Sequence, residues 1–191
     1  MSGDDKRRAI LESARALFLR FGKRKTSVDQ IARTAGIGKG TIYSYFPSKD
    51  DIWAELLQSE ADKLIAAIEG AVDKARGYRD KLTAYALTRF NYIQRELDML
   101  NLDERILEEF YPEVEEIREI FLGREQKLIA RLLSEGVAVG EFRPVDTELL
   151  AFTIIAVMRG LEIPWIWQRQ LVGVEERMHT LLDVFYNGLL A

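Results

Sequence analysis

The fold of this 191-residue chain is decided by one stretch, Ser27-Val-Asp-Gln-Ile-Ala-Arg-Thr-Ala-Gly-Ile-Gly-Lys-Gly-Thr-Ile-Tyr-Ser-Tyr-Phe46. Ser27 is placed to cap a first helix, and Gln30 three residues later completes a capping box. Apolar residues then recur at helical spacing, and Gly36 suits the left-handed conformation that ends a helix. A second helix follows from about Lys39. The stretch therefore predicts two short helices joined by a tight glycine turn.

The second helix of this hairpin is expected to expose side chains that suit DNA. Ile42 and Phe46 share its buried face. Small residues allow close approach to base edges, and hydroxyl and lysine groups hydrogen-bond to bases or phosphates. A simpler alternative is a helical hairpin inside a larger bundle with no DNA role. The Tyr43 ring has its own alternative, packing on the first helix, and this packing and a DNA contact could both hold. The residues expected away from the buried face are Lys39, Gly40, Thr41, Tyr43, Ser44 and Tyr45.

Positive charge is concentrated around the hairpin. Residues 1–52 hold 11 Lys and Arg against 6 Asp and Glu, a net charge of +5, whereas residues 53–191 hold 16 against 25, a net charge of −9. A polyanion such as DNA is attracted to a cationic head and repelled by an acidic remainder, which orients the encounter. The charge distribution therefore favours the DNA-binding interpretation.

The residues on both sides of the hairpin extend this pattern to a known family. In order and spacing they resemble the tetracycline-repressor (TetR) family of bacterial transcription regulators over roughly residues 5–60. One departure is Gly38, where the family often has serine, so that a side-chain cap is lost. The matching positions are Ile10, Ala14, Phe18 and Gly22, then Thr26-Ser27-Val28, Ile31-Ala32 and Ala35-Gly36-Ile37, then Lys39-Gly40-Thr41-Ile42-Tyr43-Ser44-Tyr45-Phe46, and Ser48-Lys49-Asp50-Asp51-Ile52.

The resemblance implies that the helix from Lys39 to Tyr45 lies in the major groove of operator DNA. Gly40, Thr41 and Ser44 would then lie nearest the bases. Members of this family bind near-palindromic operators as homodimers, and most repress transcription until a small ligand enters the second domain. The DNA-backbone contacts that the resemblance implies are made by Thr26, Ser27, Tyr43, Tyr45 and Lys49.

The composition is that of a globular helical protein, with 48% hydrophobic and 30% charged residues. The chain has no cysteine, which excludes disulfides and thiolate metal sites and is typical of the cytoplasm. No stretch reaches the ~20 apolar residues of a membrane span. We expect an all-α protein of about nine helices. Its helix-turn-helix DNA-binding domain is expected at residues 4–50, with the helix-turn-helix itself at 27–46, and its helical effector-binding and dimerisation domain at residues 51–191.

Within the second domain, the expected boundaries depend on proline and glycine. Pro112 is placed to begin a helix, Gly136 and Gly140 to mark a turn, and Pro164 to kink or end the nearly all-apolar segment 149–161. The long helix that begins after Ser48 leaves the first domain and can act as a lever. The helices expected after the hairpin cover residues 48–74, 79–100, 103–110, 112–135, 146 to about 164, and 174–190.

The last two expected helices carry more apolar surface than one small domain needs. Pairing with the same helices of a second chain would bury that surface in a two-fold four-helix interface. The alternative is that these residues form the chain's own core. The expected dimer contacts are Phe152, Ala156, Leu181, Leu182, Phe185 and Leu189.

Aromatic residues of the second domain predict a mostly apolar cavity for a hydrophobic or amphipathic effector. Aromatic residues at helical spacing also form ordinary cores, so both interpretations stay open. Arg159 lies in an apolar run and needs a partner, which could be Glu162, a carboxylate of the second subunit, or an anionic ligand. Arg89 and Arg124 are further candidates for a polar anchor. The expected lining residues are Phe90, Phe110, Tyr111, Phe121, Trp165 and Trp167.

Two other functions fit the sequence less well. The segment Glu176-Arg-Met-His179 matches the Glu-x-x-His element of helical di-metal proteins, but those sites need two such elements. His179 is the only histidine, so we expect no metal, no cofactor and no catalytic site. A helical scaffold or ligand-binding dimer without DNA binding is the other alternative, and the intact set of candidate DNA contacts argues against it.

Overall fold

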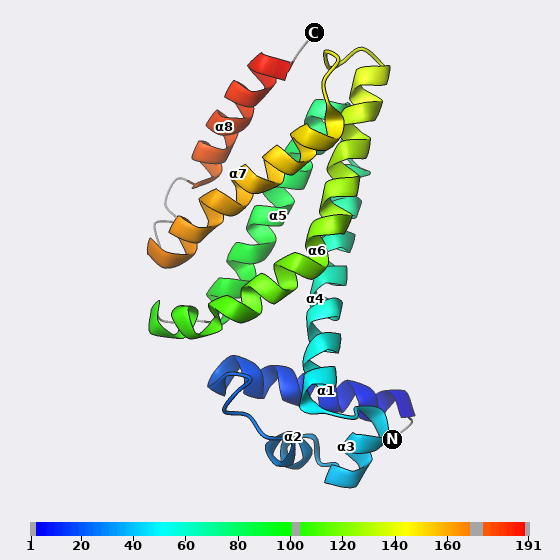
Figure 1. Cartoon of the computed structure of the whole chain (residues 1–191), viewed down its shortest axis with the longest axis vertical. Coiled ribbons are helices and arrows are strands. Elements are labelled where there is room, and N and C mark those ends of the chain that lie inside the picture. The colour runs from blue at the N-terminus through cyan, green and yellow to red at the C-terminus, as the bar shows by residue number, and fades with distance from the viewer. Residues whose placement is uncertain (1–2, 101–103, 169–173, 190–191) are drawn as a thin grey trace. The chain divides into compact units, whose positions relative to one another are not determined.

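The computed structural model describes the backbone of residues 3–100, 104–168 and 174–189, and every helix or strand assigned in these ranges is an α-helix (Figure 1). The all-α prediction is confirmed. The helices are α1 Gly3–Phe21, α2 Val28–Ala35, α3 Lys39–Tyr45, α4 Lys49–Val72, α5 Tyr78–Leu100, α6 Glu104–Ala138, α7 Thr147–Gln168 and α8 Val174–Leu189.

The chain forms two compact units, each with its own buried side chains. The first unit comprises Met1–Ala61 and Glu109–Ile117, and the second comprises Asp62–Glu108 and Arg118–Ala191. Helix α6 thus contributes residues to both units. In the part of the chain that the structure describes, no helix has the length and apolar character needed to cross a membrane.

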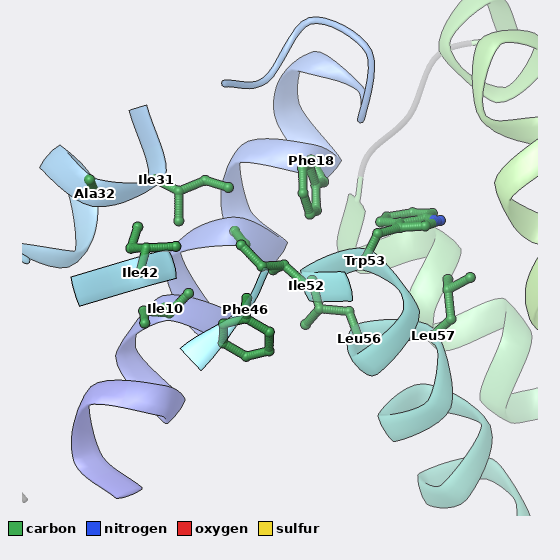
Figure 2. Close-up of a cluster of buried hydrophobic side chains, with 11 residues drawn as sticks. Ile10, Phe18, Ile31, Ala32, Ile42, Phe46, Ile52, Trp53, Leu56 and Leu57 are labelled. Atoms are coloured by element: carbon green, nitrogen blue, oxygen red, sulfur yellow. The ribbon is translucent and has the colours of Figure 1, made fainter. Parts of the chain in front are cut away.

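The core of the first unit joins α1, α2, α3 and the start of α4 (Figure 2). Residues four apart on α1 supply one stripe of this core, as expected for a helix with one buried face. Phe18 meets the Trp53 ring edge-to-face, with ring centroids 5.3 Å apart. The core residues are Ile10, Ala14, Phe18, Ile31, Ala32, Ile42, Phe46, Ile52, Trp53, Leu56 and Leu57. This packing fixes α3 against α1 and α2.

Helix ends in the first unit follow the local sequence signals. The Ser27 hydroxyl accepts the Gln30 amide at 3.3 Å, and the Gln30 side chain accepts the Ser27 amide at 2.8 Å. Gly36 ends α2 with a φ of 65°, a left-handed conformation that favours glycine. Gly38 caps α3 without any side-chain hydrogen bond. The capping box and the glycine turn are confirmed.

The helix boundaries predicted from proline and glycine within residues 51–191 are partly wrong. Helix α6 runs from Glu104 to Ala138 and includes Pro112, so the two helices expected at 103–110 and 112–135 are one, and eight helices are described instead of about nine. A proline removes one amide donor and can distort a helix without ending it. For the same reason α7 continues past Pro164 to Gln168.

Gly136 lies inside α6 instead of in a turn, and close packing explains it. A Cβ atom built on Gly136 would lie 2.3 Å from Cδ2 of Phe142, which real structures do not show. The missing side chain therefore lets the Phe142 ring, 1% exposed, pack directly on the helix. The turn itself is made at Gly140, whose φ is 78°.

Polar contacts tie the helices of the second unit together. The Glu141 carboxylate accepts the backbone amides of Tyr78 and Arg79 at 2.9 and 2.8 Å, which caps the start of α5. The Tyr186 hydroxyl on α8 donates to the Arg79 carbonyl at 2.8 Å and lies 2.9 Å from the Thr83 hydroxyl. The end of α8 is therefore held against the start of α5.

Candidate nucleic-acid interface and ligand cavity

Helix α3 presents a polar surface opposite its buried Ile42. Lys39, Gly40 and Ser44 are exposed, and Thr41 is half-buried. The Tyr43 side chain is 46% exposed and does not belong to the buried cluster of the first unit, so part of its surface is accessible to an external molecule. By contrast, the half-buried Tyr45 ring packs against the cluster.

Gly40 is not required by the packing of the protein. No heavy atom lies within 4 Å of the position that a Cβ on this residue would take, and its φ is not positive. Glycine is a poorer helix former than alanine. The packing of the first unit therefore gives no reason for glycine at this position.

Lys39 is already paired within the protein. Its ammonium lies 2.9 Å from Asp29 Oδ2 on α2, and both side chains are about half exposed. The hydrogen bond from Lys39 to Asp29, followed by the charge of that carboxylate, raises the pKa of Lys39. The lysine is therefore fully charged at neutral pH, and a phosphate would have to compete with Asp29 for it.

Lys49, the first residue of α4, and Thr26 hold the loop between α1 and α2 in place through hydrogen bonds. The Lys49 ammonium donates to the carbonyls of Lys23 and Thr26 at 2.8 and 2.9 Å. Thr26 is only 2% exposed, and its hydroxyl donates to the Gly22 carbonyl at 2.9 Å. The Thr26 hydroxyl therefore points inward and ties the loop to the end of α1, and it is not placed for the direct side-chain contact with DNA that is expected for Thr26.

The same loop carries basic side chains at the surface. Arg24 and Lys25 are exposed. Lys23 is paired with Asp50 at 3.0 Å, and its ammonium lies 5.5 Å from the centroid of the Trp53 ring. Ser27, next along the chain, is exposed although its hydroxyl oxygen accepts the Gln30 amide. The loop thus exposes two basic side chains and holds the third, Lys23, in an ion pair with the start of α4.

Within the first unit, a hydrogen bond connects Trp53 of α4 with Glu116 of α6. The indole N–H of Trp53 donates to Glu116 Oε2 at 2.7 Å, and Glu116 belongs to the stretch Glu109–Ile117 that packs with this unit. Trp53 also closes the core through its contact with Phe18. A shift of Glu116 would therefore act directly on Trp53, the core residue that packs against Phe18 of α1.

The second unit contains an apolar cavity of about 200 Å³ between α5, α7 and α8. The hydroxyls of its two polar residues are occupied: Thr153 donates to the Leu149 carbonyl at 2.8 Å, and Tyr85 donates to Glu125. The cavity therefore suits an apolar group. Its lining residues are Leu82, Tyr85, Ala86, Leu150, Thr153, Ile154, Val157, Met158, Met178, Leu181, Leu182 and Phe185.

This cavity is not the one that the aromatic residues predicted. Phe90 and Phe121 are buried but do not line it. Arg159 pairs with Glu119 of α6 at 3.2 Å, a carboxylate of its own chain that the sequence did not single out. Leu181, Leu182 and Phe185, which are expected at a dimer interface, also line this cavity. The side chains of Phe110, Tyr111, Trp165, Trp167 and Leu189 lie outside the described residues.

A buried ion pair lies next to this cavity. Arg89 Nε of α5 is 2.5 Å from Glu125 Oε1 of α6, and both side chains are 1% exposed. Tyr85 of the cavity wall donates its hydroxyl to the same carboxylate. Burial, and then the Glu125 charge, raises the pKa of Tyr85 well above its usual value. The tyrosine therefore stays protonated and remains a donor.

Helices α7 and α8 also expose apolar side chains on the surface of the second unit. Leu149 and Phe152 on α7 are 62% and 55% exposed, and Val184 on α8 is 67% exposed. Ala156 is exposed as well. Leu149 and Val184 were not singled out from the sequence. Glu176 and His179 are both exposed on α8.

Comparison with known proteins places this geometry among transcription regulators. The family model of bacterial regulatory proteins of the tetR family matches residues 10–56. The transcriptional repressor KstR2 of Mycolicibacterium smegmatis is 30% identical over 187 residues, which cover 96% of this chain and 90% of that protein. The fatty acid degradation regulator FadR of Bacillus halodurans is 25% identical, with a TM-score of 0.69 over 95% of this chain and 96% of that chain. FadR of Bacillus subtilis in complex with stearoyl-CoA has a TM-score of 0.71 at 22% identity, over 95% and 98% of the two chains.

Proposed function

This chain belongs to the tetR family of bacterial regulatory proteins, and on that premise we propose that it is a homodimeric repressor of the cytoplasm without catalytic activity. It binds a near-palindromic operator and leaves it when a hydrophobic or amphipathic effector occupies the second unit. The observation that carries the proposal is the exposed polar face of α3, with a glycine that the protein itself does not need.

In the proposed complex, α3 enters the major groove. Gly40, Thr41 and Ser44 approach the base edges, where small and hydroxyl side chains fit closely. The phosphate and sugar contacts are made by Ser27, Lys39, Tyr43, Tyr45 and Lys49, while Thr26 acts by holding the loop. Lys49 keeps one ammonium hydrogen for a phosphate after donating to two carbonyls.

The proposed dimer buries the exposed apolar side chains of α7 and α8. Leu149, Phe152 and Val184 are large apolar residues with more than half of their surface in water in a single chain. Such a face on a soluble protein marks an interaction surface. A two-fold pair sets two copies of α3 about 34–36 Å apart, one turn of B-DNA.

The proposed effector places an apolar group in the cavity between α5, α7 and α8. FadR of Bacillus halodurans is a fatty acid degradation regulator, and FadR of Bacillus subtilis forms a complex with stearoyl-CoA. Both similarities support an effector with an apolar part. An effector that prefers a different separation of the two α3 helices shifts the dimer away from the operator. Helix α4, which begins in the first unit and continues into the second, transmits the shift.

DNA binding is tested by gel shift with the promoter beside the protein's own gene. Tyr43→Ala should weaken the complex at least tenfold while leaving the dimer intact. Val139→Ala, a substitution at a 64% exposed residue of the second unit, is the matched control and should bind as the wild type does. Absence of any shift at low salt would support the scaffold alternative.

The dimer is tested by light scattering with charge substitutions. Phe152→Glu should produce a monomer that has lost operator binding, because a carboxylate cannot be buried unpaired in an apolar interface. Val139→Glu places the same charge on another exposed apolar residue, 64% exposed against 55% for Phe152, and should stay dimeric. A Phe152→Glu protein that remains dimeric would refute the proposed interface.

A further inference from the structure

A buried polar cluster lies next to one wall of the apolar cavity. The Tyr85 ring lines the cavity, and its hydroxyl donates to Glu125, which is paired with Arg89 at 2.5 Å. Of the residues that the structure describes, Tyr85 alone belongs both to the cavity wall and to this polar cluster. Turning its ring aside would join the cavity to Glu125.

The stability of the second unit does not explain this buried ion pair. Removing a guanidinium and a carboxylate from water costs about as much free energy as their pairing returns, and apolar side chains of similar volume often serve as well. Buried charges beside a cavity are a frequent mark of a functional site. The proposed DNA contacts and dimer face make no use of Arg89 or Glu125.

One oxygen of the cluster lacks a donor. Glu125 Oε1 accepts the Tyr85 hydroxyl and lies 2.5 Å from Arg89 Nε in the ion pair, whereas Oε2 is buried and accepts no hydrogen bond from the described residues. A buried acceptor without a donor costs free energy, which a ligand that supplies the donor would recover. The cluster therefore has the chemistry to recognise the polar end of a ligand.

We propose that the effector carries a neutral hydrogen-bond donor, in the simplest case an alcohol, which binds Glu125 Oε2 while its apolar part fills the cavity. This inference rests on the proposed function and names the chemical class of the effector. The donor must be neutral because the charges of Arg89 and Glu125 already cancel. A carboxylate ligand would repel Glu125, and an ammonium ligand would repel Arg89.

The volume of the cavity decides which small molecules can be used to test the proposal. A 150 Å³ cavity binds benzene, so about 200 Å³ accommodates roughly eight non-hydrogen atoms. 1-Octanol is close to this size and ends in a hydroxyl. Its isomer heptyl methyl ether has the same atoms and no donor, and octanoate has the same chain with a negative charge.

Calorimetric titration of the DNA-free protein with these three probes tests the proposal. 1-Octanol should bind at least tenfold more tightly than heptyl methyl ether, and octanoate should bind more weakly than 1-octanol. The double variant Arg89→Met, Glu125→Leu replaces the ion pair by apolar side chains and should bind the alcohol and the ether equally. Thr153→Val removes the other polar residue of the wall and should keep the preference for the alcohol.

Three results would overturn the proposal: equal binding of the two isomers by the wild type, no binding of 1-octanol up to its solubility limit, or a preference that survives in the double variant. If the double variant fails to fold, Glu125→Gln replaces it as the test. Loss of the charge should reduce the preference for 1-octanol over heptyl methyl ether several-fold. These measurements use no operator DNA. Their failure would leave the gel-shift test of the proposed repressor unaffected.

Discussion

Replacing Gly40 by alanine should raise the free energy of unfolding of the protein and lower its affinity for operator DNA. A Cβ at this position meets no heavy atom within 4 Å in the free protein, so the substitution only removes the conformational freedom of glycine. That gain is about 0.5 kcal/mol, the low end of the usual range, because Gly40 is the second residue of α3. In the proposed complex the same methyl group would crowd the base edges. Crowding of this kind costs about 1–3 kcal/mol, roughly a 5- to 150-fold loss of affinity.

Two measurements on one pair of variants separate these effects. Urea denaturation reports the free energy of unfolding, and a gel shift reports operator affinity. Gly70→Ala on α4 is the matched control, because a Cβ there also meets no heavy atom within 4 Å, and it should stabilise the protein without changing DNA binding. Unchanged operator affinity in a stabilised Gly40→Ala protein would show that this side of α3 does not approach DNA. A destabilised protein would refute the packing argument itself.

Three further substitutions test other contacts. Lys49→Met leaves the carbonyls of Lys23 and Thr26 without the ammonium, and should lower the free energy of unfolding by about 1.5–3 kcal/mol in urea denaturation. Gly136→Ala forces a methyl group into the Phe142 ring and should destabilise the protein by about 1–3 kcal/mol, whereas an unchanged melting temperature would contradict the packing described for this residue. Burial raises the pKa of Tyr186 to about 12; because the unfolded chain loses this proton near pH 10, stability should fall as the pH rises from 10 towards 12. In Tyr186→Phe that alkaline loss should be smaller, which denaturation at a series of pH values would measure.

The helix-turn-helix could be predicted because its signals are local. Ser27 and Gln30 cap a helix within three residues, and Gly36 ends it through its own backbone conformation. The contacts of the loop before α2 could not be predicted in the same way. Lys49 reaches back 23 residues to the Thr26 carbonyl, and no spacing rule encodes such a contact. The sequence therefore predicts a DNA contact for Lys49, although part of the role of this lysine is to hold the fold.

The cavity was harder to place from the sequence. Helical periodicity identifies which side chains face inward, but it does not tell a packed core from a cavity wall. Phe90 and Phe121 face inward as predicted, yet they do not line the cavity between α5, α7 and α8. The ion pair left a signal that could have been used. Arg89 continues the buried face of α5 at a spacing of four from Tyr85, and Glu125 lies four residues after Phe121 on α6. Charges on a buried stripe require a partner.

The ion pair between Lys39 and Asp29 bears on how operator binding will respond to added salt. When Lys39 moves to a phosphate, the DNA releases about 0.9 of a condensed cation, while Asp29 loses its own positive neighbour and draws cations from the solution. The net number of ions released by this lysine is therefore smaller than for one that starts unpaired. A titration against potassium chloride will accordingly suggest fewer phosphate contacts than the complex makes, and Asp29→Asn will bring the two numbers together.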